Sequence, residues 1–512
     1  MATDENTDGN VVKENVVKQV VTIGLDAGTT GCKAVALSPA GQLLETTSGT
    51  YPLKTDASGR AEQDPEAIWS AVCKALRSLA KRLPDHHIAG IALSGAMHSV
   101  LPLSSNYQPL TDAITWADSR ASDYPERLRE RTDPAALYAR TGCPLETPYH
   151  PARLNWLHDS QPDVFAKTHT FAALKDFLVL RLSGTLMTDI GLASTTGLFD
   201  IYTLTWQDQA LVLAGIGPDK LPEFGLPTDR AGTLTDAAAT ATGLPAGLPI
   251  FLGSSDGGLA NLGSGVVRAG ETILTLGTSG AVRQVADAPQ LDPNQLTWCY
   301  VLGEGHYFAG GAINNGGLTL EWLRRTFYSE LPSQAGFAKL LEESAEAASS
   351  DLICLPYLTG ERTPHWDADL RASFFGIGEH HTRADLVRAG LEGVAFCLAD
   401  VFELVRPSDR PVQLSGGAAR APFLAQLLTD TLGVPTETND VADASALGAA
   451  VIAQVGLGLT TLSEAAARLA HASQARLEPN PEAHAHYREK RARARNLLEA
   501  VASVTAKPTS AA

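Results

Sequence analysis

A pattern of strand, glycine-threonine turn and strand occurs twice in this 512-residue chain. In the first copy, apolar residues 20–25 lead into the turn Asp26-Ala27-Gly28-Thr29-Thr30-Gly31. In the second copy, residues 272–276 lead into Gly277-Thr278-Ser279-Gly280, and a further apolar segment follows each turn. The two Gly-Thr pairs lie almost half a chain apart. Self-similarity at this spacing indicates an internal duplication, which restricts the fold to two halves of related design.

Around these turns the sequence alternates between strand-like and helix-like patterns. Asp64-Pro65 marks a helix start, because aspartate caps a first turn and proline suits the first helical position. The same reasoning predicts strands at 42–47, 88–93 and 412–414, and helices at 382–406, at 421–432 and from about 479. We therefore expect an α/β fold of two domains, with glycine-rich turns at strand ends where ligands usually bind.

Length and composition exclude several classes of protein. A chain of 512 residues is too long for one ordinary core, which favours two large domains. The formal net charge of −17 argues against a nucleic-acid partner, whose phosphates need a basic face. Six scattered cysteines without a C-x-x-C pair predict neither a disulfide framework nor a zinc site. The polar, acidic N-terminus and the small residues of the uncharged stretch 444–462 predict a soluble cytoplasmic protein without a membrane span.

The first glycine-threonine turn has the chemistry of a phosphate site. Gly28 lets the backbone approach a phosphate closely, and Thr29 and Thr30 offer hydroxyl and N–H donors. Asp26, at the strand end, is suited to hold Mg²⁺ directly or through water. An ordinary tight hairpin is the alternative. The second turn, Gly277-Thr278, favours the phosphate interpretation, because two opposed hairpins can grip one polyphosphate between two domains.

Two further turns combine glycines with candidate functional groups. Asp256 lies among small residues in Gly253-Ser254-Ser255-Asp256-Gly257-Gly258, as expected of a general base or a metal-linked carboxylate, and equally of a helix N-cap. Gly416 and Gly417 separate a strand from a helix, which suits a flat purine ring or a simple connection. The chain has neither a G-x-G-x-x-G fingerprint nor a P-loop motif, so dinucleotide and P-loop sites are disfavoured.

Two polar clusters resemble substrate contacts. Met97 and His98 form one, and the segment around Trp116, Asp118 and Arg120 forms the other. The ring of Trp116 can stack on a sugar, while Asp118 and Arg120 can bind hydroxyls or a carboxylate, for which arginine offers a bidentate grip. A lone histidine is more often structural, but the presence of Met97, Trp116 and Asp118 at predicted strand ends favours a binding role for His98.

Taken together, these motifs resemble those of the FGGY carbohydrate kinases, of the actin/hexokinase-like ATPase superfamily, over roughly residues 20–460. The two glycine-threonine turns resemble the family's phosphate motifs, and Ser415-Gly416-Gly417-Ala418 resembles its adenosine motif. The C-terminal signature is matched by Phe374-Phe375-Gly376-Ile377, Asp385-Leu386 and Leu391-Glu392-Gly393. The resemblance implies two related actin/hexokinase-like, ribonuclease H-like ATPase domains with a catalytic cleft between them.

Within the family, several segments are most similar to gluconokinases: Ser94-Gly95-Ala96-Met97-His98-Ser99, residues 114–120, residues 193–199 and residues 355–364. Xylulokinases share Met97-His98 and the segment 355–364. The implied reaction is ATP-dependent phosphorylation of the terminal hydroxyl of D-gluconate to 6-phospho-D-gluconate. A kinase for xylulose or another ketose or polyol is the alternative, and a non-catalytic actin-like or sugar-binding protein is a more distant one. A small sugar acid is the implied partner, and a homodimer is compatible with the family.

The resemblance assigns a role to each candidate residue. Asp256 is the catalytic base and, with Asp26, a ligand of Mg²⁺. ATP and its phosphates are bound by Gly28, Thr29, Thr30, Gly277, Thr278, Gly311, Gly416 and Gly417. Substrate is bound by Met97, His98, Trp116, Asp118, Arg120 and Asp256. The expected division is a polar tail at 1–18, an N-terminal sugar- and phosphate-binding domain at 19–264, an ATP-binding domain at 265–460 and a helical extension and tail at 461–512.

Three positions depart from the family's pattern. Arg153 stands where the first signature usually has lysine, Gly390 occupies a position that usually carries another small or aliphatic residue, and Ala421 replaces an asparagine that some relatives place near the adenine. Adenine contacts are therefore assigned only to the glycines. Because ATP and gluconate are both anions, we expect His98, Arg120 and Arg153 to create a locally positive site in an acidic protein.

Overall fold

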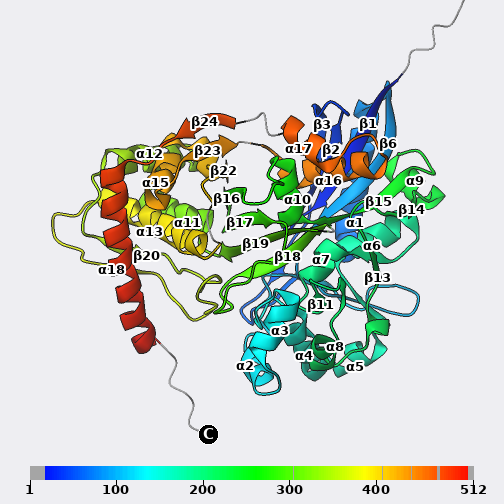
Figure 1. Cartoon of the computed structure of the whole chain (residues 1–512), viewed down its shortest axis with the longest axis horizontal. Coiled ribbons are helices and arrows are strands. Elements are labelled where there is room, and N and C mark those ends of the chain that lie inside the picture. Colours follow the sequence, from blue (N-terminus) through cyan, green and yellow to red (C-terminus); the bar gives the residue numbers. More distant parts are fainter. Residues whose placement is uncertain (1–17, 304, 406–407, 440, 470–472, 506–512) are drawn as a thin grey trace, which may run out of the picture.

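Two large β-sheets form the framework of the computed structural model, which describes residues 18–505 apart from 304, 406–407, 440 and 470–472 (Figure 1). The predicted tail at 1–18 and the end of the chain after 505 lie outside these residues, Lys18 excepted. The first sheet belongs to the N-terminal half and the second to the C-terminal half. The predicted α/β class is therefore confirmed.

The first sheet has six strands in the spatial order 3-2-1-6-15-14. These strands are β3 (Leu43–Thr50), β2 (Gly31–Leu37), β1 (Gln19–Ala27), β6 (His86–Gly95), β15 (Pro249–Ser255) and β14 (Arg230–Thr233). The strands β1, β6 and β15 are parallel, and the flanking pairs are antiparallel.

The second sheet repeats this topology. Its seven strands follow the order β18 (Trp298–Gly303), β19 (His306–Ile313), β17 (Gly280–Ala286), β16 (Thr272–Leu276), β22 (Val412–Gly416), β23 (Thr436–Asn439) and β24 (Ser473–Leu477). From β19 onward the pairs are antiparallel, antiparallel, parallel, parallel and antiparallel, which is the sequence of pairings from β3 to β14 in the first sheet. The internal duplication that the two turns predicted is thus present in the strand order.

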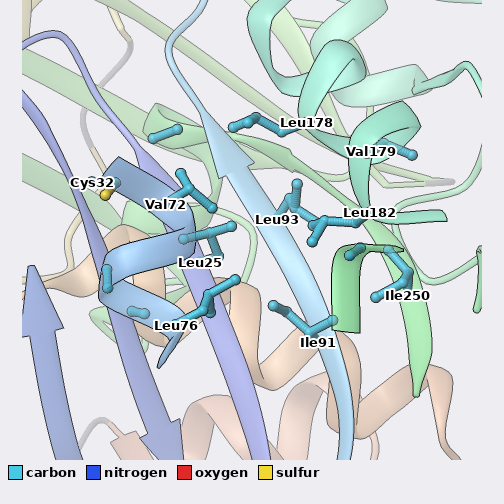
Figure 2. Packing of buried hydrophobic residues seen from close by; sticks show 14 of the residues in the cluster. Leu25, Cys32, Val72, Leu76, Ile91, Leu93, Leu178, Val179, Leu182 and Ile250 are labelled. Atoms are coloured by element: carbon cyan, nitrogen blue, oxygen red, sulfur yellow. The ribbon is translucent and has the colours of Figure 1, made fainter. Parts of the chain in front are cut away.

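Helices cover one face of the first sheet with an apolar layer. The helix α1 (Pro65–Arg82) begins where the sequence predicted, with the Asp64 carboxylate accepting from the N–H groups of the first turn. Val72 and Leu76 from α1 and Leu178 from α6 (Leu174–Ser183) lie on strand residues such as Leu93, all of them fully buried (Figure 2). This layer fixes the strands whose ends carry the predicted phosphate and substrate residues.

The opposite face of the first sheet is covered by a helix from the second half of the chain. The helix α16 (Ala444–Gly456) lies against β1 and crosses α10 (Asp256–Gly263) (Figure 1). The contacts leave no room for side chains: a Cβ on Gly24 would lie 1.8 Å from the carbonyl oxygen of Ala446, and one on Gly448 would lie 2.1 Å from that of Leu259. The uncharged stretch of small residues at 444–462 thus contains a buried helix that connects the two halves.

The region beyond residue 460 divides its contacts between the halves. The helix α17 (Leu462–Leu469) packs with α16 on the first sheet, whereas β24 extends the second sheet. The helix α18 (Pro481–Thr505) packs against α13 (Arg383–Leu404) and α15 (Pro422–Leu432), which cover the second sheet. The predicted domain boundary after residue 264 falls in the connection between α10 and β16. Among the described residues, none of the helices combines the length and the apolar character needed to cross a membrane.

A helical region that the sequence patterns did not predict is inserted between β6 and β15. Its helices include α2 (Tyr124–Arg129), α3 (Pro134–Thr141), α4 (His150–Ser160) and α8 (Asp208–Ala214), which share a separate apolar cluster. The segment from Trp116 to Arg120 precedes α2, so this region carries one of the two predicted substrate clusters.

Candidate active site

The parallel strands of the first sheet bring three candidate groups to one edge. Asp26 pairs in register with Ser94 near the end of β6, and Ser254 near the end of β15 pairs with the same residue. Asp256 follows two positions later, and Met97 and His98 follow β6. Because the carboxyl ends of parallel strands lie at the same edge of a sheet, the local sequence order places these groups together.

Asp26 and Asp256 both lie where a negative charge is unfavourable. Burial raises the pKa of Asp26 to about 7, the charge of Asp256 adds to that rise, and a hydrogen bond from Ser94 (Oγ to Oδ1, 2.6 Å) opposes it. Burial also raises the pKa of Asp256 to about 6. Perturbed carboxyl groups at strand ends are typical of functional sites.

Asp256 is positioned by backbone donors and by one cation. It is the first residue of α10 and accepts from the N–H of Gly257 at 2.7 Å, while Ser255 occupies the N-cap position. The N–H of Met97 and the buried guanidinium of Arg283 also lower its pKa. The N-cap alternative for Asp256 is therefore wrong by one position, since its carboxylate does not cap the helix.

The strand before Asp256 is held by a buried ion pair. Gly253 has a positive φ of 67°, and the register between β15 and β6 shifts at this point. The fully buried Lys175 donates to the carbonyl of Leu252 at 3.1 Å and pairs with Asp189 at 3.1 Å. Asp189 in turn accepts from Ser254 Oγ at 2.8 Å. These bonds fix the backbone of β15 directly before Asp256.

The two glycine-threonine turns have their carbonyl groups occupied within the protein. Tyr51 donates to the carbonyl of Gly28 at 2.7 Å and Gln63 to that of Thr29 at 2.7 Å. In the second turn, the N–H of Gly317 donates to the carbonyl of Gly277 at 2.7 Å. The N–H of Leu318 donates to the carbonyl of Thr278 at 2.9 Å. These carbonyl oxygens would repel a phosphate, and hydrogen bonds within the protein hold them.

Several N–H groups of the same turns have no partner among the described residues. Those of Thr29, Thr30, Thr278 and Ser279 donate to no acceptor within the described part of the chain. Such backbone donors, presented by turns at strand ends, are suited to bind phosphate oxygens. The arrangement is the same in both halves, as the duplication requires.

His98 is held in one tautomer. Its Nδ1 lies 2.8 Å from the carbonyl oxygen of Thr195, which can only accept, so Nδ1 carries the proton and Nε2 is an acceptor. Burial and the nearby charge of Arg153 lower the pKa of His98 well below its usual value, which keeps the ring neutral. Its φ of 63° is rare for a residue with a side chain. A neutral imidazole of this kind can accept a hydrogen bond from a sugar hydroxyl.

Asp118 and Arg120 form an ion pair with each other rather than presenting free charges. Arg120 Nη2 lies 2.7 Å from Asp118 and also binds Glu62 on β5 (Ala61–Gln63). Its guanidinium stacks 4.3 Å above the ring of Trp156. Asp118 additionally accepts from the N–H of Ala61 at 2.9 Å. The expectation that Arg120 provides the positive charge of the site is corrected, because two carboxylates neutralise it.

A cleft of about 440 Å³ lies between the halves. Its lining from the first half includes Trp116, Asp118 and Glu146, and its lining from the second half includes Thr278, Asn314, Arg362 and Trp366. The Trp116 Nε1 donates to Thr29 Oγ1 at 2.9 Å, so the predicted substrate cluster touches the first turn. Asp26, Asp256, Met97 and His98 are not among the residues that line this cleft.

Arg362 and the tyrosine pair Tyr149–Tyr300 were not assigned to the site from sequence. Arg362 lies 4.9 Å over the Trp116 ring, and the two tyrosine hydroxyls are 2.8 Å apart beside His98. Arg153, named only as a departure from the family signature and a source of positive charge, donates Nη1 to the carbonyl of His98 while its Nε and Nη2 have no partner among the described residues. The signal for Arg362 was present: Glu361-Arg362 is the only charged pair in the segment 355–364.

The remaining predicted glycines differ in role. Gly416 has a φ of 71°, which favours glycine, and the carbonyl of Leu276 would lie 2.6 Å from an added Cβ. Gly311 does not belong with the turns. It is buried within β19, where a Cβ would lie 2.3 Å from the side chain of Thr363, so packing explains the absence of a side chain, and the ATP contact stays a prediction.

The two strand-end carboxylates fit a magnesium ion. No group of three or more His, Cys, Asp or Glu residues suited to a metal occurs among the described residues. Mg²⁺, however, is commonly held by one or two carboxylates together with substrate phosphates and water. Asp26 and Asp256 provide two oxygen-bearing groups whose raised pKa values a cation would relieve.

The sequence matches two family models in succession. The N-terminal domain of the FGGY family of carbohydrate kinases matches residues 21–263, and the C-terminal domain matches residues 273–457. A gluconokinase of Bacillus subtilis (strain 168) is 34% identical over 448 residues, which are 85% of this chain and 87% of that protein. A xylulose kinase of Lactococcus lactis subsp. lactis (strain IL1403) is 30% identical over 476 residues, 91% of this chain and 94% of that protein.

A solved structure agrees with the sequence matches. The crystal structure of gluconate kinase from Lactobacillus acidophilus is 31% identical and has a TM-score of 0.88, covering 94% of this chain and 98% of that one. Its two-domain fold accounts for the repeated sheets, and the family models span both of them. The chain therefore belongs to the FGGY family of carbohydrate kinases and is an ATP-dependent sugar kinase.

Proposed function

We propose that the enzyme phosphorylates the terminal hydroxyl of D-gluconate, giving 6-phospho-D-gluconate and ADP. The observation that carries this proposal is the 34% identity to the Bacillus subtilis gluconokinase, against 30% to the Lactococcus lactis xylulose kinase. The motifs at 114–120 and 193–199, which are most similar to gluconokinases, support the same choice; Trp116 lines the cleft and the carbonyl of Thr195 binds His98.

In the proposed reaction, Asp256 accepts the proton of the terminal hydroxyl as the oxygen attacks the γ-phosphorus. The new O–P bond forms while the bond from phosphorus to the ADP oxygen breaks. Its raised pKa places Asp256 close to neutrality, where a general base is effective. The transition state is loose, so orientation by His98 and by the backbone donors matters more than base strength.

The two turns hold the polyphosphate in this proposal. The N–H groups of Thr29, Thr30 and Thr278 donate to its oxygens, and Gly416 and Gly417 lie beneath the adenosine. Asp26 and Asp256 would hold Mg²⁺, which supplies positive charge to the phosphates. Closure of the two halves over the cleft excludes water, which would otherwise compete with the sugar as the nucleophile.

A substrate panel tests the proposal. D-Gluconate, D-xylulose, D-ribulose and glycerol are each supplied with ATP, and ADP release is followed by a coupled assay. We expect the highest kcat/KM for D-gluconate. A higher value for any neutral sugar or polyol contradicts the gluconate assignment while leaving the kinase assignment intact.

Xylulose kinase is the second candidate function. It is favoured by the 30% identity that extends over 91% of this chain, a larger share than the gluconokinase match covers. The segment 355–364 and Met97-His98 are shared by both subfamilies, so neither distinguishes them. The charge of the substrate does, because xylulose is neutral and gluconate carries a carboxylate.

A further inference from the structure

Three arginines near the cleft differ in how their charge is balanced. Arg120 is paired with two carboxylates, and Arg283 faces Asp256, whose charge acts on it. Arg362 makes no ion pair within the described part of the chain, and the charge that acts on it is that of its neighbour Glu361. Arg362 is half-buried and lines the cleft. Among the described residues, Arg362 is therefore a cation of the cleft whose guanidinium no carboxylate contacts.

The adjacent carboxylate of Glu361 acts on this charge through space, but its oxygens bind other donors. Glu361 accepts from the backbone N–H of Asn314, from Asn315 Nδ2 at 3.1 Å and from the backbone N–H of Arg362 at 2.8 Å. The guanidinium of Arg362 does not donate to it. Glu361 thus fixes the backbone at this point and leaves the guanidinium directed elsewhere.

The guanidinium is held rigidly by neutral partners. Its Nε donates to Asn314 Oδ1 at 2.7 Å, its Nη2 donates to the carbonyl of Ile313 at 3.3 Å, and its Cζ lies 4.9 Å from the centre of the Trp116 ring. Anchoring by an amide, a carbonyl and a ring preserves the positive charge. It also reduces the entropy lost when an anion binds.

We propose that Arg362 binds the carboxylate of the sugar acid, at the end of the substrate opposite the hydroxyl that is phosphorylated. This inference rests on the proposed function. Its neighbours Trp116, Tyr149 and Tyr300 are aromatic groups suited to a sugar chain, whereas backbone N–H groups are available for the phosphates.

Paired ligands of different charge test the proposal. Binding of D-gluconate and of its neutral analogue D-gluconamide is measured by calorimetry on the full chain. For Arg362→Gln we expect D-gluconate binding to weaken about tenfold to a hundredfold, the effect of losing a charge-assisted hydrogen bond, and D-gluconamide binding to change less than about threefold. Arg362→Lys keeps the charge but loses the bidentate geometry, so its affinity for D-gluconate should lie between those of wild type and Arg362→Gln. An intermediate affinity also shows that the site still folds.

Arg181 provides a matched control. It stacks over Trp69 at 4.8 Å and pairs with Glu66, which is nearly the same arginine–tryptophan geometry away from the cleft. Arg181→Gln should leave the binding of both ligands unchanged. Equal weakening of D-gluconate and D-gluconamide in Arg362→Gln, or no weakening of either, overturns the inference.

Kinetics distinguish a carboxylate from a phosphate ligand. If Arg362 instead binds a phosphate of ATP, Arg362→Gln raises the KM for ATP and leaves D-gluconate binding intact, which also overturns the inference. Wild-type enzyme that turns over D-gluconate while Arg362→Gln binds it normally contradicts this inference alone. Wild-type enzyme that neither binds nor phosphorylates D-gluconate overturns the proposed function and this inference together.

Discussion

At the residue scale, the two strand-end carboxylates are placed where their charge costs stability. Asp26 and Asp256 lie within reach of each other's charge, and burial raises both pKa values. Without bound ligand, the protein would be more stable if Asp26 and Asp256 were replaced by neutral groups. Sites that bind charged ligands often retain such unfavourable groups, because function requires them.

The first prediction concerns catalysis by Asp256. Asp256→Asn keeps the shape of the side chain and removes the proton acceptor, so kcat should fall about 10²- to 10⁴-fold, with little change in ATP binding. Steady-state kinetics give kcat, and equilibrium titration with ATP gives its affinity. Asp163→Asn, an exposed surface change, is the control. Near-normal turnover by Asp256→Asn would remove Asp256 as the base.

The second prediction concerns stability and pH. The folded pKa of Asp26 is about 7 and the ordinary value is 3.8, so above pH 7 the folded state carries the full cost of the buried charge. Asp26→Asn should therefore be more stable than wild type at pH 8, by up to about 4 kcal/mol. As pH falls from 7 towards 4, only the folded wild type takes up the proton, and the difference should vanish.

Thermal melting with a chelator and without nucleotide measures this difference at pH 8, 6 and 4. Asp163→Asn should show no comparable dependence. If Asp26→Asn melts below wild type at pH 8, the carboxylate is stabilising and the assigned environment is incorrect.

At the element scale, the crossing of α10 and α16 transmits the position of one half to the catalytic group of the other. Asp256 begins α10, and Ser445 at the start of α16 donates to its carbonyl at 3.1 Å. Where the helices cross, Gly263 lies against the carbonyl of Ala444 and Gly448 against that of Leu259. Two glycines permit an approach that no other residue allows.

The third prediction follows from this crossing. In Gly448→Ala the added Cβ would lie 2.1 Å from the backbone oxygen of Leu259, so the helices must separate. We expect a loss of about 1–3 kcal/mol in stability and a lower kcat, because Asp256 moves with α10. Gly303→Ala, where no atom lies within 4 Å of the new Cβ, is the control. Unchanged melting and turnover in Gly448→Ala would contradict the close contact.

At the scale of the whole molecule, the cleft is formed by residues of both halves, so its shape depends on how the halves are arranged. Trp116 comes from the first half and Thr278 from the second, and both line the same cavity. Phosphoryl transfer to a sugar rather than to water requires the cavity to close around both substrates.

The fourth prediction is that the halves approach each other when both substrates are bound. Small-angle scattering of wild type with D-gluconate and a non-hydrolysable ATP analogue should give a smaller radius of gyration than the free enzyme. D-Gluconate with inorganic sulfate in place of the analogue is the control and should give a smaller change. Identical scattering curves with and without ligands would show that the cleft does not close.

The sequence alone determined the features that depend on short segments. The repeated turns, the helix start at Asp64-Pro65 and the buried strand at 20–25 follow from local patterns of apolar residues, caps and glycines. They were sufficient to predict two related α/β halves, and the motifs were sufficient to identify the family. The positions of Asp26 and Asp256 at one sheet edge followed from the same strand order.

Only the tertiary structure decided which charges are available to a ligand. Arg120 and Arg362 are both arginines in polar motifs, and nothing in either motif distinguishes them. The difference arises from Glu62, 58 positions before Arg120, which neutralises it across the fold, while Asn314 holds Arg362 without neutralising it. The balance of a buried charge depends on residues that are distant in sequence, and a local pattern carries no information about them.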